Sequence, residues 1–242
     1  MSQSNIRTTY FNKPIIVVEG IIGAGKTTIT QLLEKELQLK GHYEPVDANK
    51  YLKLFYAEEA RIRAGGDKPN KYAFPMQMEL MYQRFAMHKS ACWEAAQFNQ
   101  HKGAIIDRSI FGDRVFAKLL TRYGNIEPIM WETYQKTFWI LSQDFMPPQY
   151  MIFLDTPVET AWKRARGDMG RNRDQETPME NDDFYNYLID LQKEHHELIR
   201  EIENGMHTWS NYIEIIKIPW DNGLAEEEVQ PVIKTIREKI GL

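Results

Sequence analysis

The sequence lacks most of the features that mark extracellular or membrane proteins. Its 242 residues include a single cysteine, Cys92, so no disulfide can form within the chain. No stretch approaches the roughly 18 consecutive apolar residues that a transmembrane helix needs, and residues 1–14 lack the apolar core of a secretory signal. We therefore expect a cytoplasmic protein that does not span a membrane.

An excess of positive charge is also missing. Lys and Arg number 30 against 34 Asp and Glu, which gives a net charge of −4. Proteins that bind nucleic acid generally carry a basic face, so we expect no nucleic-acid partner. Hydrophobic residues make up 43% of the chain, enough to bury a core. Because no internal repeat or low-complexity linker divides the sequence, we expect one domain over residues 1–242.

Short apolar, β-branched runs alternate with longer segments of helical periodicity. The runs typical of strands buried on both faces are residues 15–18, 103–107, 150–155 and 212–218, with a further short strand leading into residues 44–46. Helical patterns follow the first run up to Gly41, and then cover roughly residues 75–98, 127–145, 183–203 and the chain after Leu224. This alternation predicts an α/β fold with a parallel five-stranded sheet and helices on both faces.

Two polar stretches interrupt the alternation. Residues 57–71 contain Gly-Gly and Pro, and we expect an inserted loop there. The second stretch is rich in arginine, with Arg164, Arg166, Arg171 and Arg173 close together, and we expect an arginine-rich lid at about residues 165–178. Both are candidates for segments that cover a site.

A glycine-rich motif follows the first predicted strand. The sequence GIIGAGKT, residues 20–27, matches G-x-x-x-x-G-K-[ST] at every fixed position. Such a loop between a strand and a helix wraps backbone N–H groups around phosphates, with Lys26 reaching the β- and γ-phosphates and the Thr27 hydroxyl ligating Mg²⁺. The predicted phosphate-binding residues are Gly20, Gly23, Ala24, Gly25, Lys26, Thr27 and Thr28.

This loop alone is compatible with a kinase, a GTPase-like switch or a motor ATPase. A switch needs a guanine-reading Asn-Lys-x-Asp motif. The two Asn-Lys pairs, at residues 49–50 and 70–71, lack the following Asp, which weakens that interpretation.

Three further motifs follow in order: EPVDANKYLKLFY (residues 44–56), DRSIFGDRVFA (residues 107–117) and the arginine-rich stretch. Together with EGIIGAGKTT, residues 19–28, they resemble the deoxynucleoside kinase family from residue 15 to about residue 218. The form of the second motif is most similar to the bacterial and phage branch that acts on deoxyadenosine and deoxyguanosine. The resemblance implies a P-loop kinase fold, ATP with Mg²⁺, a deoxynucleoside acceptor and a homodimer, for which residues 130–141 are a candidate face.

The resemblance also implies roles for residues around the reacting groups. Glu44 is the expected general base for the acceptor 5′-hydroxyl, although a Glu before Pro is also an ordinary turn residue. Arg108 is expected to contact the 5′-oxygen and the incoming phosphoryl group. Asp107 is expected to hold Mg²⁺ with Thr27, although many relatives have the longer Glu at this position. Lys26 and Arg164 complete the expected catalytic set.

Recognition of the nucleoside is expected from a second group of residues. Gln77 and Arg84, two helical turns apart, and Asp113 resemble the base-reading set of relatives that accept purines or deoxycytidine. Phe74 and Phe111 are candidates to flank the base, with an ordinary core position as the alternative for each. Tyr56 and Asp174 are expected to bind the sugar 3′-hydroxyl.

On the donor side, the resemblance implies that Arg164, Arg166 and Arg171 bind phosphate and that Asp221, in the segment PWDNG, contacts the ATP base. The sequence therefore predicts an ATP-dependent kinase of deoxyadenosine, then of deoxyguanosine or deoxycytidine. A deoxynucleoside monophosphate kinase is the alternative, with Arg61, Arg63 or Lys68 binding the acceptor phosphate. A non-catalytic nucleotide-binding subunit is a more remote alternative.

Overall fold

The computed structural model describes residues 13–45, 48–97, 100–144, 146–166, 181–221, 223 and 225–241. Its centre is a five-stranded sheet in which every pairing is parallel, in the order β2-β3-β1-β4-β5. The strands are β1 (Ile15–Glu19), β2 (Lys40–His42), β3 (Ala104–Asp107), β4 (Tyr150–Asp155) and β5 (Glu214–Pro219). This is the predicted parallel α/β sheet, and its order places β1 between β3 and β4.

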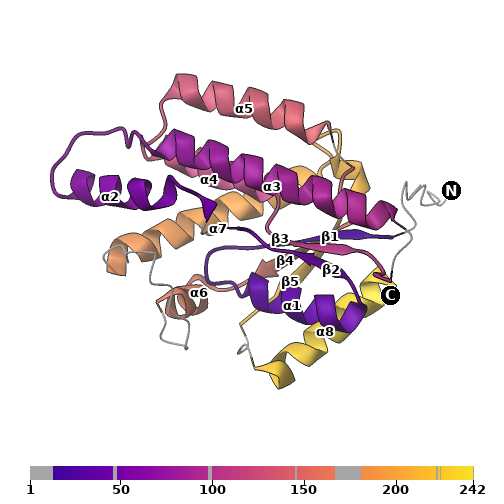
Figure 1. Cartoon of the computed structure of the whole chain (residues 1–242). Helices are drawn as coiled ribbons and strands as arrows, with labels where there is room; N and C mark the ends of the chain where they lie inside the picture. The colour runs from indigo at the N-terminus through magenta and orange to yellow at the C-terminus, as the bar shows by residue number, and fades with distance from the viewer. Residues whose placement is uncertain are drawn as a thin grey trace.

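Helices cover both faces of the sheet, as predicted (Figure 1). They are α1 (Lys26–Leu37), α2 (Leu52–Arg63), α3 (Ala73–Ala96), α4 (Ile110–Arg122), α5 (Pro128–Ser142), α6 (Val158–Ala165), α7 (Asn181–Glu203) and α8 (Glu226–Ile240). In Figure 1, α1 and α8 lie below the sheet and α3 and α4 above it, with α5 forming an outer layer over them. A short 3₁₀ turn, Ser210–Tyr212, precedes β5.

The core follows from this layering. Ile16, Val17 and Ile105 are fully buried, as are Met151 and Ile152 on the neighbouring strand. Strands covered on both faces need apolar side chains at consecutive positions, which explains the unbroken runs in the sequence. All parallel strands end at the same edge, so Glu19 and Asp107 end neighbouring strands there, and the segment after β2 leads to Glu44 at the same edge.

Two local boundary predictions were wrong. The second strand ends at His42, so Glu44 lies in the loop after the strand rather than within it. Helix α1 ends at Leu37, where Gln38 adopts a left-handed conformation (φ 56°), instead of at Gly41. Gly41 belongs to β2, where its amide donates to the Glu34 carboxylate at 2.9 Å.

The segment predicted as an inserted loop, residues 57–71, is helical in its first part, because α2 continues to Arg63. Its alternating charged side chains, including the Glu58–Arg61 pair, are compatible with a solvent-facing helix as well as with a loop. Helix α4 was not predicted as a helix, although Ser109 caps its first turn by accepting from the amides of Phe111 and Gly112.

None of the helices that the structure describes has the length and apolarity needed to cross a membrane.

Candidate active site

The glycine-rich loop connects β1 to α1 and approaches its neighbours very closely. Gly23 and Gly25 have φ values of 81° and 87°, a region that residues with a Cβ rarely adopt. A Cβ on Gly23 would lie only 2.1 Å from the carbonyl oxygen of Ala161 in α6. The loop therefore takes a path open only to glycine at this position, with the N-terminus of α1 directly behind it.

Lys26 lies at the centre of this loop and is 5% exposed. Its Nζ donates to the carbonyl oxygen of Ile21 at 2.6 Å, so the ammonium is held within the curve of the loop. Burial, and the nearby charge of Arg108, hold the pKa of Lys26 well below its ordinary value, while Asp107, Glu19 and Glu44 act in the opposite direction. This arrangement suits a lysine whose charged form is stabilised by the negative phosphates of a nucleotide.

Thr27 and Asp107 meet where α1 begins and β3 ends. The Thr27 hydroxyl donates to Oδ2 of Asp107 at 2.6 Å. The other carboxylate oxygen, Oδ1, is buried and has no hydrogen-bond partner within the described residues. A hydroxyl and an unpaired carboxylate oxygen beside a phosphate-binding loop fit the ligand preferences of Mg²⁺, which takes few protein ligands and keeps water and phosphate oxygens.

Glu44 lies between two arginines. Its Oε1 accepts from Arg84 Nε at 2.9 Å and Nη2 at 2.5 Å, and its Oε2 is 3.3 Å from Arg108 Nε. Burial acts to raise the pKa of Glu44, but the charges of Arg84 and Arg108 outweigh it and hold the pKa below its ordinary value. The carboxylate is therefore ionised at neutral pH, as a proton acceptor must be.

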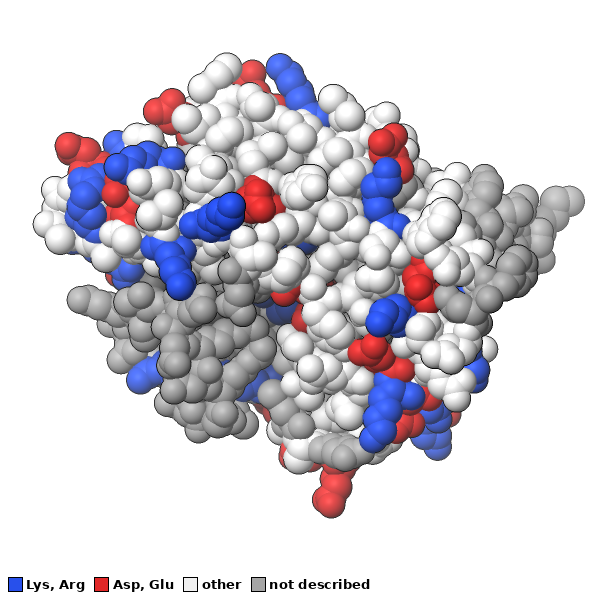
Figure 2. Space-filling model, in the orientation of Figure 1, with Lys and Arg blue, Asp and Glu red and all other residues white. Residues whose placement is uncertain are grey.

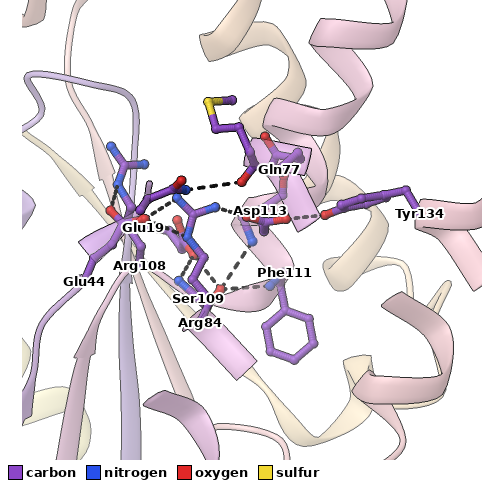
Figure 3. A network of polar contacts seen from close by, with 12 residues as sticks. Glu19, Glu44, Gln77, Arg84, Arg108, Ser109, Phe111, Asp113 and Tyr134 are labelled. Carbon is purple, nitrogen blue, oxygen red and sulfur yellow. Dashed lines mark hydrogen bonds and ion pairs between the residues drawn. The ribbon is translucent and has the colours of Figure 1, made fainter. Parts of the chain in front are cut away.

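Arg84 also connects Glu44 to a buried group on α4 and α5 (Figure 3). Its Nη1 forms an ion pair with Asp113 Oδ1, and the Tyr134 hydroxyl donates to Asp113 Oδ2. Gln77 donates to the Asp113 carbonyl oxygen at 3.3 Å, while its own Oε1 is buried without a hydrogen-bond partner among the described residues. The three predicted base-reading residues are thus brought together, with a carboxamide oxygen left available for a ligand.

Glu44, Gln77, Arg84 and Arg108 line one open pocket. Figure 2 shows the molecular surface hollowed near its centre, with charged side chains inside the hollow. The pocket is lined by Ile22, Glu44, Leu52, Phe55, Tyr56, Met76, Gln77, Leu80, Arg84, Arg108, Phe116, Leu120 and Tyr187. Because Ile22 belongs to the glycine-rich loop, the pocket adjoins the phosphate-binding loop directly.

For the two candidate aromatic residues, the structure favours the alternative of a core position. Phe111 is fully buried, with its ring centroid 4.2 Å from that of Trp209, and points away from the polar network (Figure 3). Phe74 packs against the hydrophobic core and does not line the pocket. Phe116 lines it instead, with its ring 5.1 Å from the Arg108 guanidinium. Its position one helical turn after Asp113 was the signal that sequence analysis missed.

Other lining residues were also not predicted. Tyr187 comes from α7, far from the other motifs in the sequence, and only the fold brings it to the pocket. Tyr56 lines the pocket, as its expected sugar-binding role requires. Asp174 lies outside the described residues.

Beside the glycine-rich loop, α6 brings Arg164 to the phosphate-binding side. Arg164 is 3% exposed, and its Nη1 donates to the Ala24 carbonyl oxygen at 3.4 Å. Its guanidinium lies 5.9 Å from the ring of Trp220. Arg166 instead lies over the ring of Trp162, at 4.5 Å.

The other donor-side residues are placed less centrally. Asp221 is exposed and accepts a hydrogen bond from Thr160, which places it beside α6. Thr28 is half-buried in the first turn of α1. Arg171 and the expected lid from residue 167 onwards lie outside the described residues.

Comparisons with known proteins agree with this geometry. The sequence model of the family described as deoxynucleoside kinase matches residues 16–240. A deoxyadenosine kinase of Dictyostelium discoideum is 33% identical over 236 residues, covering 98% of this chain and 84% of the relative. A deoxyguanosine kinase of Lactobacillus johnsonii is 33% identical over 166 residues, covering 66% of each chain.

Among solved structures, a deoxyadenosine kinase from M. mycoides with bound dATP superposes with a TM-score of 0.67 at 22% identity. The match covers 94% of this chain and 100% of the other. At this identity the likeness supports the fold.

Proposed function

This chain belongs to the deoxynucleoside kinase family, and from that premise we propose that it phosphorylates the 5′-hydroxyl of deoxyadenosine, and then that of deoxyguanosine or deoxycytidine. As a deoxynucleoside kinase, it transfers a phosphoryl group from ATP to a deoxynucleoside. The observation that carries the more specific proposal is the shared pocket, in which Glu44 and the base-reading residues Gln77 and Arg84 lie beside Ile22 of the phosphate-binding loop.

The proposed reaction uses the groups at the sheet edge. Glu44, ionised between two arginines, accepts the proton of the 5′-hydroxyl as the oxygen attacks the γ-phosphorus of ATP. Arg108 contacts the attacking oxygen and the transferred group, and Lys26 and Arg164 offset the negative charge on the phosphate oxygens. Mg²⁺ bound with ATP would be held by Thr27 and Asp107 and would neutralise part of that charge.

The preference for deoxyadenosine rests on the polar groups that face the base. Arg84 is a donor and the Gln77 carboxamide is both a donor and an acceptor. Adenine presents an acceptor nitrogen and an amino donor side by side on one edge, which a carboxamide can pair with in two bonds. Thymine offers a methyl group at one edge, which would leave buried polar groups without partners. Relatives named deoxyadenosine kinase and deoxyguanosine kinase support a purine deoxynucleoside as acceptor.

A monophosphate kinase on the same fold is the main alternative, and the positions of the candidate cations disfavour it. Figure 2 shows Lys and Arg side chains gathered over the end of the molecule where α2 lies. Arg61 is paired with Glu58, Arg63 donates to the Glu59 carbonyl oxygen, and Lys68 donates to that of Tyr123. None of the three lines the pocket, where a monophosphate would instead meet the carboxylate of Glu44.

A non-catalytic nucleotide-binding subunit is the more remote alternative. The deciding experiment measures phosphoryl transfer from ATP–Mg²⁺ to the four deoxynucleosides and, in parallel, to the four monophosphates. Turnover of deoxyadenosine with inert monophosphates is expected. Turnover of monophosphates alone would replace the proposed acceptor, and tight ATP binding without any turnover would support the non-catalytic alternative.

We further propose that the protein is a cytoplasmic homodimer. The cytoplasmic location is supported by the dependence on ATP and by the single cysteine. The dimer is supported by large apolar side chains exposed on α3 and α5, namely Tyr82, Trp93, Ile129 and Ile140. The predicted face, residues 130–141, is only partly available, because Tyr134 and Phe138 within it are buried in the core of the same chain.

A further inference from the structure

Glu19, the last residue of β1, has no role in the reaction described above, yet it lies under the site. It is 1% exposed and stands directly before the phosphate-binding loop. Burying a carboxylate is costly unless its oxygens gain strong partners. Its partners come from the segment that carries Arg108 (Figure 3).

Within the described residues, both hydrogen bonds to Glu19 come from Ser109 and end on Oε1, while Oε2 is buried without a partner. The Ser109 amide donates to Glu19 Oε1 at 2.7 Å, and the Ser109 hydroxyl donates to the same oxygen at 2.5 Å. The hydroxyl oxygen in turn accepts from the amides of Phe111 and Gly112, so it also caps α4. A Cβ on Gly112 would lie 2.5 Å from Glu19 Oε2, so the first turn of α4 is packed directly against the carboxylate.

The residue between β3 and this capped helix is Arg108, whose backbone is strained. Its φ of 70° lies in the left-handed region that residues other than Gly, Asn and Asp rarely adopt. Its own amide donates to the Val18 carbonyl oxygen at 3.1 Å, and the next amide, of Ser109, is held by Glu19. Consecutive residues of β1 thus hold the amides on either side of the strained residue.

The Glu19 side chain supplies the next hydrogen-bond acceptor at the point where the backbone hydrogen bonds of β1 end. Beyond Glu19 the chain turns into the phosphate-binding loop at Gly20, which has a φ of 150°. The carboxylate therefore supplies the acceptor that a further strand residue would have offered to Ser109. The same bonds fix the position of the Arg108 segment relative to the phosphate-binding loop.

We propose that Glu19 is a positioning residue for catalysis, which aims Arg108 at the transferred phosphoryl group by clamping Ser109 against the end of β1. This inference rests on the proposed role of Arg108 in the kinase reaction. On this proposal, the length of the Glu19 side chain, rather than its charge, is what the reaction requires.

Two substitutions separate reach from charge. Glu19→Gln keeps a carbonyl oxygen at the position of Oε1 and loses the charge, whereas Glu19→Asp keeps the charge and shortens the side chain by about 1.5 Å, one carbon–carbon bond. We expect kcat of the Gln variant to stay within about threefold of wild type. We expect kcat of the Asp variant to fall on the order of a hundredfold, the effect of a displacement of about 1 Å in a catalytic group. The KM for ATP should change little in either.

Arg108→Ala supplies the second test. If Glu19 acts through Arg108, adding Glu19→Asp to Arg108→Ala should lower kcat by less than about threefold further, because interacting residues are not additive. Glu201 forms an ion pair of 2.7 Å with Arg114 of α4, and it gives the matched control. Its Asp and Gln variants should lower the melting temperature while leaving kcat unchanged.

The inference is overturned if the Asp variant of Glu19 is as active as the Gln variant, if the Gln variant is the weaker of the two, or if Glu19→Asp lowers kcat equally with and without Arg108. Failure of the proposed function is recognised separately. Absence of wild-type turnover would remove the kinase proposal itself, and an unchanged kcat in Arg108→Ala would remove the role of Arg108.

Discussion

The guanidinium of Arg84 donates to the carboxylate of Glu44 through two nitrogens, Nε at 2.9 Å and Nη2 at 2.5 Å. The same guanidinium pairs with Asp113 through its third nitrogen, so one side chain joins the predicted base-reading group to the predicted general base. A change in the base-reading group therefore reaches Glu44 through a single residue.

Glu44→Gln removes the group that accepts the 5′-hydroxyl proton. We expect kcat to fall at least about 100-fold, the low end of what a positioned general base contributes, with ATP affinity unchanged because the phosphate-binding loop is intact. Steady-state kinetics and ATP titration measure both quantities. Glu59→Gln is the matched control, since Glu59 is buried and bonded to Asn70 outside the pocket. An unchanged kcat in Glu44→Gln would remove Glu44 from the role of base.

The lowered pKa of Glu44 predicts an acid limit of activity below the ordinary glutamate value of 4.5. Activity needs the ionised carboxylate, so kcat/KM should stay level as the pH falls to that value and decrease only below it. Burial opposes ionisation of Glu44, and the charges of Arg84, Arg108 and Lys26 favour it.

Arg84→Gln removes one of the two charges that outweigh burial, so the acid limb of kcat/KM should move to higher pH. The linkage to stability has the same sign. A carboxylate with a lowered pKa stabilises the fold above its unfolded value, and that contribution is lost as the pH falls through the folded value. A pH–rate profile with its midpoint above 4.5 in the wild type would contradict the assignment.

Tyr134→Phe leaves Asp113 Oδ2 buried without its donor. A buried acceptor without a partner costs about 1–3 kcal/mol of stability, and the freed carboxylate can turn away from Arg84. We expect a lower melting temperature together with a higher KM for deoxyadenosine. Tyr123→Phe is the matched control, because it removes a Tyr–Asp bond of 2.8 Å to Asp190, outside the pocket. It should lower stability without changing KM, and equal kinetic effects in both variants would refute a role for Tyr134 in binding.

Gly23→Ala should disable nucleotide binding. The added Cβ meets the backbone of α6 at 2.1 Å and also has to adopt a φ of 81°, a conformation that costs about 1–3 kcal/mol by itself. Gly65→Ala separates the two effects, since Gly65 has a φ of 98° and nothing within 4 Å of an added Cβ. We expect ATP titration to show weakened binding only for Gly23→Ala. Unchanged ATP affinity in that variant would contradict the close packing of the loop on α6.

Much of the sheet edge was predictable because local patterns encode it. Residues such as Ile16 and Ile105 lie in apolar runs that mark buried strands, and the spacing of glycines before Lys26 requires a phosphate-binding turn. The boundaries of β2 and α1 were harder, because a left-handed Gln38 ends the helix where no local rule predicts it. Glycine is the common residue at such an end, so the sequence predicted that the helix would end at Gly41.

The parts of the pocket that escaped prediction depend on contacts between distant segments. Tyr187 reaches the pocket only because α7 packs along α4, and the burial of Phe111 against Trp209 joins residues that lie 98 positions apart by their numbering. Glu19 was visible in the motif, but nothing local shows that its carboxylate binds Ser109 rather than solvent. Periodicity assigns a residue to a face, and packing decides what that face meets.

The proposed dimer predicts where the chain associates. Tyr82 and Trp93 on α3 are 64% and 72% exposed, and Ile129 and Ile140 on α5 are 65% and 68% exposed. The two residues of each pair lie three helical turns apart and so point to the same side of their helix. Figure 1 shows α5 as the outermost helix on the face where α3 lies. Apolar side chains of this size on neighbouring helices are typical of a surface that a second copy covers.

Light scattering after size exclusion should therefore report a dimer for the wild type and a monomer for Trp93→Glu and Ile140→Glu, because a buried unpaired charge at an interface is strongly unfavourable. Met206→Glu is the matched control, since Met206 is 65% exposed but follows α7, outside this pair of helices. It should remain dimeric. A monomeric wild type, or a loss of the dimer in Met206→Glu alone, would show that α3 and α5 do not form the interface.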